Sequence, residues 1–116
     1  MRQWDLQAHE VQPHHPQVLD SSPEGRTILL ALTAGDSLQE HQVHERAWVV
    51  VVDGEVEIED GGEHVRGGPG LLTVFDPGEP HEVRARSDAR LLLVLAPWPG
   101  EGHPSQGAHA GPAGGG

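Results

Sequence analysis

The chain has 116 residues, which is enough for one domain with its own core but not for two. Its 18 acidic and 7 basic residues give a formal net charge of −11. This charge, without any basic cluster, argues against binding to nucleic acid or to anionic membranes. Cysteine, lysine and tyrosine are absent, which excludes disulfides, thiolate ligands, Schiff-base lysines and phenolic acids.

The first 25 residues are polar and interrupted by proline, and we expect them to pack as a segment on the domain that follows. Trp4 and Leu6 are the apolar side chains that would cover one end of that domain. His14 and His15 stand between two prolines, where the backbone cannot be helical throughout. An exposed linker explains this pair better than a metal site, because nothing nearby fixes the geometry of the two rings.

Short apolar or alternating runs between Gly, Pro, Asp and Ser turns predict strands from Arg26 onward. We expect eight of them, at residues 27–34, 38–44, 47–52, 55–59, 63–66, 71–75, 81–86 and 89–96. Residues 26–96 would then form a single all-β domain, a small barrel or jelly roll. Residues 97–116 are rich in Pro, Gly and Ala, and we expect a disordered tail.

The side-chain pattern predicts which strand faces point inward. Residues 47–52 and 91–95 are apolar on both faces, which is typical of strands covered on two sides. Residues 55–59 alternate cleanly, with Val56 and Ile58 inward. His81 shares a face with Val83 and Ala85, so we expect its imidazole on the apolar, inward side.

Two short stretches carry a family resemblance. The first runs from Gly35 through His41 to Gly54, and the second is the turn Asp76-Pro77-Gly78-Glu79-Pro80-His81. In order and in spacing they resemble the paired motifs of the cupin family. The first family motif is glycine, five residues, His-x-His, three or four residues, glutamate, six residues and glycine. The second is Pro-x-Gly-x-x-His. The resemblance covers about residues 26–96 and implies the cupin double-stranded β-helix, a jelly-roll barrel.

The resemblance also implies a metal site, of which this chain keeps only part. In metal-loaded cupins, three histidines and the glutamate hold one divalent ion. His41 matches the first histidine and His81 the last. Val43 stands at the second histidine, Ala47 at the glutamate, and Asp76 at the proline of the second motif.

Two imidazoles are too few for tight binding of a divalent ion, because a catalytic metal usually has three protein ligands. His44 and Glu45 are the candidates for a third ligand. A centre of His41, His44 and His81 would hold iron, manganese, nickel or zinc. Otherwise His41 and His81 line a metal-free pocket. We expect that ligand pocket to consist of His41, Val43, Ala47, Val49, Phe75, His81 and Val83.

The degenerate motif favours a barrel that binds a small molecule for sensing or as an accessory protein. The alternative is a metal-dependent enzyme of the dioxygenase or isomerase type that uses His41, His44 and His81. A relic pocket in a structural dimer is a third hypothesis. In all three cases we expect a homodimer, because the doubly apolar strands would leave part of one barrel exposed. No signal peptide or apolar run of about 20 residues is present, so we expect a soluble cytoplasmic protein.

Overall fold

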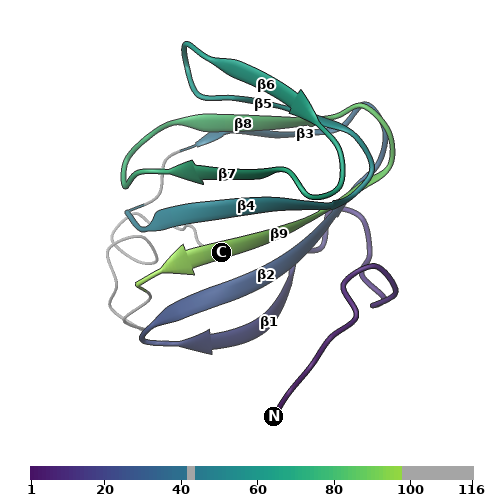
Figure 1. The fold of residues 1–116 in the computed structure, drawn as a ribbon, viewed down its shortest axis with the longest axis vertical. Coiled ribbons are helices and arrows are strands. Elements are labelled where there is room, and N and C mark those ends of the chain that lie inside the picture. Colours follow the sequence, from purple (N-terminus) through teal and green to yellow (C-terminus); the bar gives the residue numbers. More distant parts are fainter. Residues whose placement is uncertain (42–43, 98–116) are drawn as a thin grey trace.

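A computed structural model describes residues 1–41 and 44–97, which form antiparallel sheets and no α-helix (Figure 1). This confirms the all-β class and the jelly-roll barrel. The described residues contain nine strands: β1 (Gln17–Ser22), β2 (Gly25–Leu32), β3 (Ser37–His41), β4 (Arg46–Asp53), β5 (Val56–Glu59), β6 (His64–Gly67), β7 (Leu72–Phe75), β8 (His81–Ala85) and β9 (Ala89–Ala96).

The strands form two sheets that face each other. One sheet has the order β1-β2-β9-β4-β7 and the other β3-β8-β5-β6, and the strand pairs of the described residues are antiparallel. We call them the five-stranded and the four-stranded sheet. Figure 1 shows the four-stranded sheet above the five-stranded one. Strands that are distant in sequence are neighbours in both sheets, such as β2 with β9 and β3 with β8. The apolar faces are therefore buried only when the whole chain has folded.

The core lies between the sheets because alternate residues of each strand point into it. In β4 the inward residues Ala47, Val49 and Val51 are at most 3% exposed. The predicted inward positions of β5 are confirmed, with Val56 0% and Ile58 2% exposed. The core cluster as a whole contains Ile28, Leu30, Leu32, Ala47, Val49, Val51, Val56, Ile58, Phe75, Val83, Ala85, Ala89, Leu91 and Leu95.

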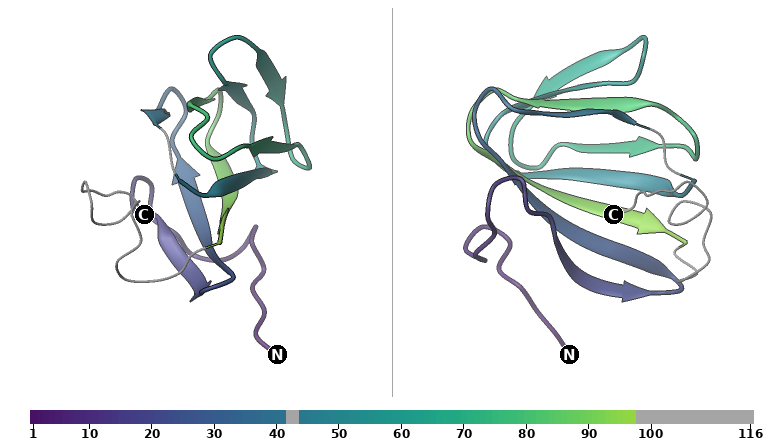
Figure 2. Two further views of the ribbon diagram at one scale, coloured as in Figure 1. Left: turned by 90° about the vertical axis from the view of Figure 1, so that its left-hand side faces the viewer. Right: turned by 180° about the vertical axis from the view of Figure 1, so that it is seen from behind.

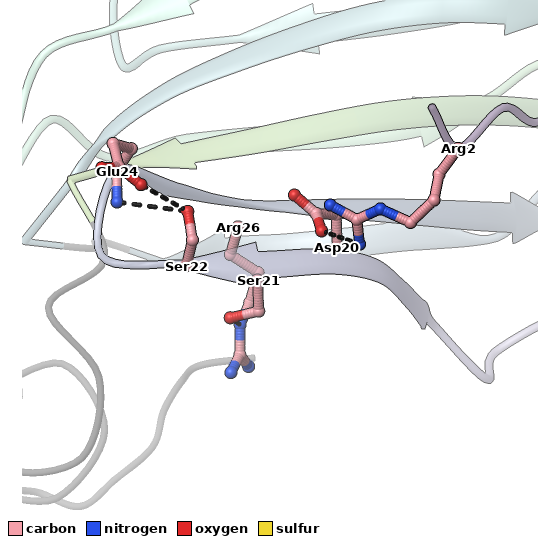
Figure 3. A network of polar contacts seen from close by, with 6 residues as sticks. All are labelled: Arg2, Asp20, Ser21, Ser22, Glu24 and Arg26. Carbon is pink, nitrogen blue, oxygen red and sulfur yellow. Dashed lines mark hydrogen bonds and ion pairs between the residues drawn. The ribbon is translucent and has the colours of Figure 1, made fainter.

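The prediction that the strands begin at Arg26 is wrong, because β1 precedes it and pairs with β2. This edge strand is largely polar and carries a bulge between Val18 and Asp20, so it has no alternation that the sequence would reveal. Polar contacts hold it instead: Arg2 pairs with Asp20 at 2.6 Å, and Arg26 Nε donates to Ser21 Oγ at 3.2 Å (Figure 3).

The N-terminal segment runs along one end of the five-stranded sheet (Figure 2). Arg90 Nη1 donates to the carbonyl oxygens of Leu6 and His9, at 2.9 and 2.6 Å. Gln7 Nε2 donates to Val52 O at 3.2 Å. The His14 N–H donates to Ala31 O, so the segment is hydrogen-bonded to the barrel at several points.

The expected tail at residues 98–116 and the predicted pocket residue Val43 lie outside the residues that the structure describes. Within residues 1–41 and 44–97, no helix is long and apolar enough to cross a lipid bilayer.

Gly54, which ends the first motif, is the glycine with the strictest steric requirement in the barrel. Its φ is +85°, and a Cβ atom there would lie 2.2 Å from Asp88 O and 2.7 Å from Ala89 Cα. The turn at Gly61 also has a positive φ, +95°, but nothing lies within 4 Å of a Cβ there. An alanine at Gly61 would therefore carry only the energetic penalty of the positive φ, whereas an alanine at Gly54 would also clash with neighbouring backbone atoms.

We expect Gly54→Ala to lower the free energy of unfolding by more than about 3 kcal/mol, because backbone atoms must move to admit the methyl group. Gly61→Ala should cost only about 1–2 kcal/mol, which is the penalty of the left-handed backbone alone. Urea unfolding followed by circular dichroism measures both. Equal losses in the two variants would contradict the steric role of Gly54.

Candidate functional site

The two motifs meet at one end of the barrel. Strand β3 ends there, β4 begins there, and the loop from β7 to β8 returns there, as the left-hand side of Figure 1 shows. The β5–β6 turn lies at the same end. The candidate site is therefore built from segments of both sheets.

A bulge in β3 sets the register of the first motif against the second. Ser37 pairs with Arg84 and Leu38 with Val83, so a regular ladder would bring position 40 opposite His81. The register shifts between Leu38 and His41, and His41 becomes the partner of His81 instead. The extra residue of the bulge thus brings together the two positions that match family histidines.

His81 points into the barrel, as the alternation of β8 predicts. Its side chain is buried, and its ring stacks on the ring of Phe75, with centroids 4.3 Å apart and planes 22° apart. Its Nδ1 lies 3.5 Å from Glu79 O in the preceding loop. One face of the imidazole is thus against an aromatic ring, and the loop approaches one of its nitrogens.

Glu45 is a buried acidic residue at this end, with 1% of its surface exposed. It lies just before β4 and two residues before Ala47, and the alternation of buried positions 45, 47, 49 and 51 continues along the strand. His44, the adjacent candidate for a third ligand, is exposed. Between the two candidates, the structure buries Glu45, and the role of His44 as a ligand stays a prediction.

The position of the family glutamate carries no donor in this chain. Ala47 is completely buried and pairs with Phe75 on β7 and with Leu95 on β9. Among the side chains that the structure describes, no three His, Asp, Glu or Cys residues come together as a metal site. The donor set of the family metal centre therefore does not fit the described residues.

Asp76, which replaces the proline of the second motif, forms an ion pair with Arg46 at the start of β4. Its backbone N–H donates to Glu79 Oε1 at 2.9 Å, and the Glu79 N–H donates to Asp76 O at 3.0 Å. These bonds close the turn around Pro77 and Gly78, whose glycine has a φ of +82°. The ion pair between Asp76 and Arg46 thus connects the β7–β8 loop to β4.

The remaining described members of the predicted pocket lie on the inner faces of the sheets. Ala47, Val49, Phe75 and Val83 are all at most 4% exposed. Among them, Phe75 is in direct contact with the His81 ring. A carboxyl or imidazole group buried in such a place costs folding free energy unless it is hydrogen-bonded or paired.

The structure also contains a cleft that the sequence pattern did not predict. It has a volume of about 400 Å³ and lies between the β5–β6 hairpin and β7. Its lining consists of Ile58, Asp60, Glu63, His64, Val65, Thr73, Val74 and Phe75. Phe75 therefore contacts the cleft on one side and the His81 ring on the other. No local signal reveals this cleft, because its walls come from two different sheets.

Asp60 holds the turn at one end of the cleft. Its Oδ1 accepts the N–H of Glu63 at 2.9 Å and of Gly62 at 3.3 Å. The hydrogen bond from Glu63 has the largest effect on the pKa of the Asp60 carboxyl, and the bond from Gly62 the next largest; both lower it from the ordinary value of 3.8. The Glu79 side chain lowers this pKa further. Asp60 is thus held as a carboxylate.

Comparison with known proteins agrees with the motifs. The family described as "Cupin domain" matches residues 28–96. An RmlC-like cupin from Desulfovibrio desulfuricans is 24% identical, with a TM-score of 0.75, and the match covers 84% of this chain and 97% of that one.

Two further structures are similar in fold. KdgF from Halomonas sp. is 22% identical, with a TM-score of 0.68 and coverage of 78% and 86%. The Schizosaccharomyces pombe Cnp3 cupin domain is 14% identical, with a TM-score of 0.73 and coverage of 83% and 74%. No curated protein sequence matches this chain.

The lowered pKa of Asp60 predicts a pH-dependent contribution to stability. The folded-state pKa lies below the unfolded value, so the contribution is fully present above pH 3.8 and is lost as the pH falls through the folded pKa. We expect Asp60→Asn to unfold more easily than the unchanged protein at about pH 6 and to differ less from it at about pH 2. Urea unfolding of both proteins measures this difference. A difference that grows toward low pH would contradict the assignment.

Proposed function

Because the chain belongs to the cupin family, and because His81 and Glu45 are buried at one end of its apolar interior, we propose that it is a small-molecule-binding barrel with a sensing or accessory role. The burial of these two groups is the observation that carries the proposal. Burial of an imidazole and of a carboxyl group costs desolvation free energy that apolar residues of similar volume would not incur. A ligand with a polar end gives both groups a role.

The pocket that we propose consists of His41, Val43, Ala47, Val49, Phe75, His81 and Val83, and we add Glu45 because it is buried just before β4. An imidazole can donate and accept a hydrogen bond, and a carboxylate accepts only. A small apolar molecule with a hydroxyl or amide group matches this set. The apolar walls would supply most of the binding free energy, and the polar groups would orient the ligand.

A metal-dependent enzyme remains the second candidate, and the burial of Glu45 is what favours it. Two imidazoles and one carboxylate are the protein ligands of many non-haem iron and catalytic zinc sites. His41, Glu45 and His81 would hold the ion. Glu45 here replaces His44, the third ligand of the metal centre expected from the sequence. A bound divalent ion would polarise an oxygen of the substrate.

A homodimer is part of the proposal and follows from the outer face of the five-stranded sheet. Two rows of paired residues cross three strands there. One row consists of Val74, Trp48 and Val94, and the other of Leu72, Val50 and Leu92. Leu72 is 53% and Val74 46% exposed. We call these six residues the apolar patch, and a second copy of the chain would cover it. A cytoplasmic location stays a prediction that suits a chain without cysteine.

Thermal unfolding of the full-length, untagged protein in excess chelator tests the first candidate. We expect a screen of small apolar alcohols and amides to contain a ligand that raises the melting temperature. At 100 times its dissociation constant, it would add about 2.7 kcal/mol of stability. His81→Ala and Glu45→Gln should lose this response, whereas His64→Ala, which removes an exposed histidine, should keep it.

Elemental analysis of the same proteins decides between the two candidates. Near-stoichiometric iron, manganese, nickel or zinc that is lost from both His81→Ala and Glu45→Gln would replace the binding module with the metal-dependent enzyme. Metal that persists in both variants would belong to other histidines of the chain and would leave the binding proposal in place.

The dimer is tested by a charge in the apolar patch. We expect the unchanged protein to have a dimeric mass in light scattering at micromolar concentration. Val74→Glu should have a monomeric mass, because a desolvated, unpaired carboxylate in the interface costs several kcal/mol. Val18→Glu is the matched control, since Val18 is 44% exposed on the edge strand β1, at the far side of the sheet from β7. A monomeric mass of the unchanged protein would overturn the proposal.

A further inference from the structure

The cleft between the β5–β6 hairpin and β7 has the properties of a binding site of its own. Val65 pairs with the inward-facing Ile58, so the register places it on the inner side of the sheet. Yet Val65 is 39% exposed, whereas Ile58 is 2% exposed. An inward-facing side chain remains open to solvent here because the cleft lies in front of it. The barrel therefore leaves part of its apolar interior accessible from this side.

Thr73 on β7 is also among the residues that line the cleft. It alternates with the exposed Leu72 and Val74, so it faces the interior together with Phe75. Among the residues that the structure describes, none forms a hydrogen bond with Thr73 Oγ1, although that atom is buried. Rotation about χ1 exchanges the hydroxyl with the methyl group of the same side chain, and a polar group in the cleft could then pair with it.

The charged groups at one end of the cleft are carboxylates. Asp60 and Glu63 line it, and the Glu79 side chain interacts with Asp60. No arginine lines the cleft. The nearby Arg66 belongs to the outer face of the four-stranded sheet, where its Nε lies 3.6 Å from Glu57 Oε2. His64 Nε2 lies 4.0 Å from the same carboxylate. Arg66 is thus paired with Glu57 outside the cleft. Among the lining residues the carboxylates are Asp60 and Glu63, and they lie beside the imidazole of His64.

We propose that this cleft binds a small organic cation, with its apolar body between Ile58, Val65 and Phe75 and its ammonium group at Asp60 and Glu63. An anionic ligand would meet like charges at this end, and a neutral one would gain no charge attraction from the two carboxylates. Thr73 would orient the ligand by a hydrogen bond. The cleft borders the proposed pocket around His81 and Glu45, because Ile58 pairs with Val83 and Thr73 with Val49. The inference does not rest on the function proposed for that pocket. The two share only Phe75.

Three probes of one shape and different charge test the proposal: benzylammonium, benzyl alcohol and benzoate. Each is titrated into the full-length protein at neutral pH, and the methyl resonances of Ile58, Val65 and Thr73 are followed by NMR. We expect these resonances to shift with benzylammonium and its dissociation constant to be at least about threefold lower than that of benzoate, the ratio that one exposed charge pair supplies. Equal affinity for all three probes, or no shift of these methyl groups, would overturn the proposal.

Two variants assign the contacts. Glu63→Gln should weaken binding of benzylammonium about two- to fivefold, as expected for one exposed charge pair. Thr73→Val keeps the shape of the side chain and should weaken binding about two- to tenfold. Glu24→Gln makes the same charge change in the β1–β2 turn, at the opposite edge of the five-stranded sheet, and should have no effect. Unchanged affinity in both Glu63→Gln and Thr73→Val would place the probe elsewhere.

Glu45→Gln separates this site from the proposed pocket. It should leave the dissociation constant of benzylammonium unchanged even where it abolishes the response to an interior ligand. A loss of benzylammonium binding in Glu45→Gln would overturn the assignment to the cleft and place the cation in the interior.

Discussion

One apolar interior shared by two sheets is the constraint on which the rest of this structure depends. The side-chain period of a strand is two, so a shift by one residue would turn the whole inward row of a strand to solvent. Strands β4, β5 and β8 each bury alternate residues almost completely. The central strand β9 pairs with both β2 and β4 and fixes their registers relative to each other. The inward direction of His81 and of Glu45 follows from this alternation.

The same period explains how the site departs from the family pattern. Ala47 occupies the glutamate position and contributes only a methyl group to the core. Glu45 stands two residues earlier, so it continues the inward row of β4 and is buried as well. Compared with the family motif, the acidic residue of this chain therefore stands two residues earlier, just before β4. A shift by one residue would have placed it in solvent, as His44 shows.

The outer face of the five-stranded sheet is partly apolar and suits a protein contact, whereas that of the four-stranded sheet is charged and suits solvent. The outer face of the five-stranded sheet carries the apolar patch and, at one end, the hydrogen-bonded N-terminal segment. The outer face of the four-stranded sheet carries charges, with Glu57 lying 2.9 Å from Arg86 and 3.6 Å from Arg66. The arginine side chains of these ion pairs are exposed, whereas the shared Glu57 side chain is only 19% exposed. The acidic cleft lies where the edge strands β6 and β7 leave the interior open.

The sequence by itself determined the fold class, the family, eight of the strands and the inward direction of His81, because alternation and turn residues are local signals. It did not reveal β1, whose polar residues are held in the sheet by their pairing with β2. It named His44 and Glu45 as candidates and placed His44 in the expected metal centre, whereas the structure buries Glu45 and exposes His44. Which of the two is buried depends on where β4 begins, and no local pattern records that. The bulge that sets His41 opposite His81 and the cleft between β5, β6 and β7 were decided by tertiary structure alone. Both arise from the pairing and spacing of strands that are distant in sequence, and no local pattern of residues records that spacing.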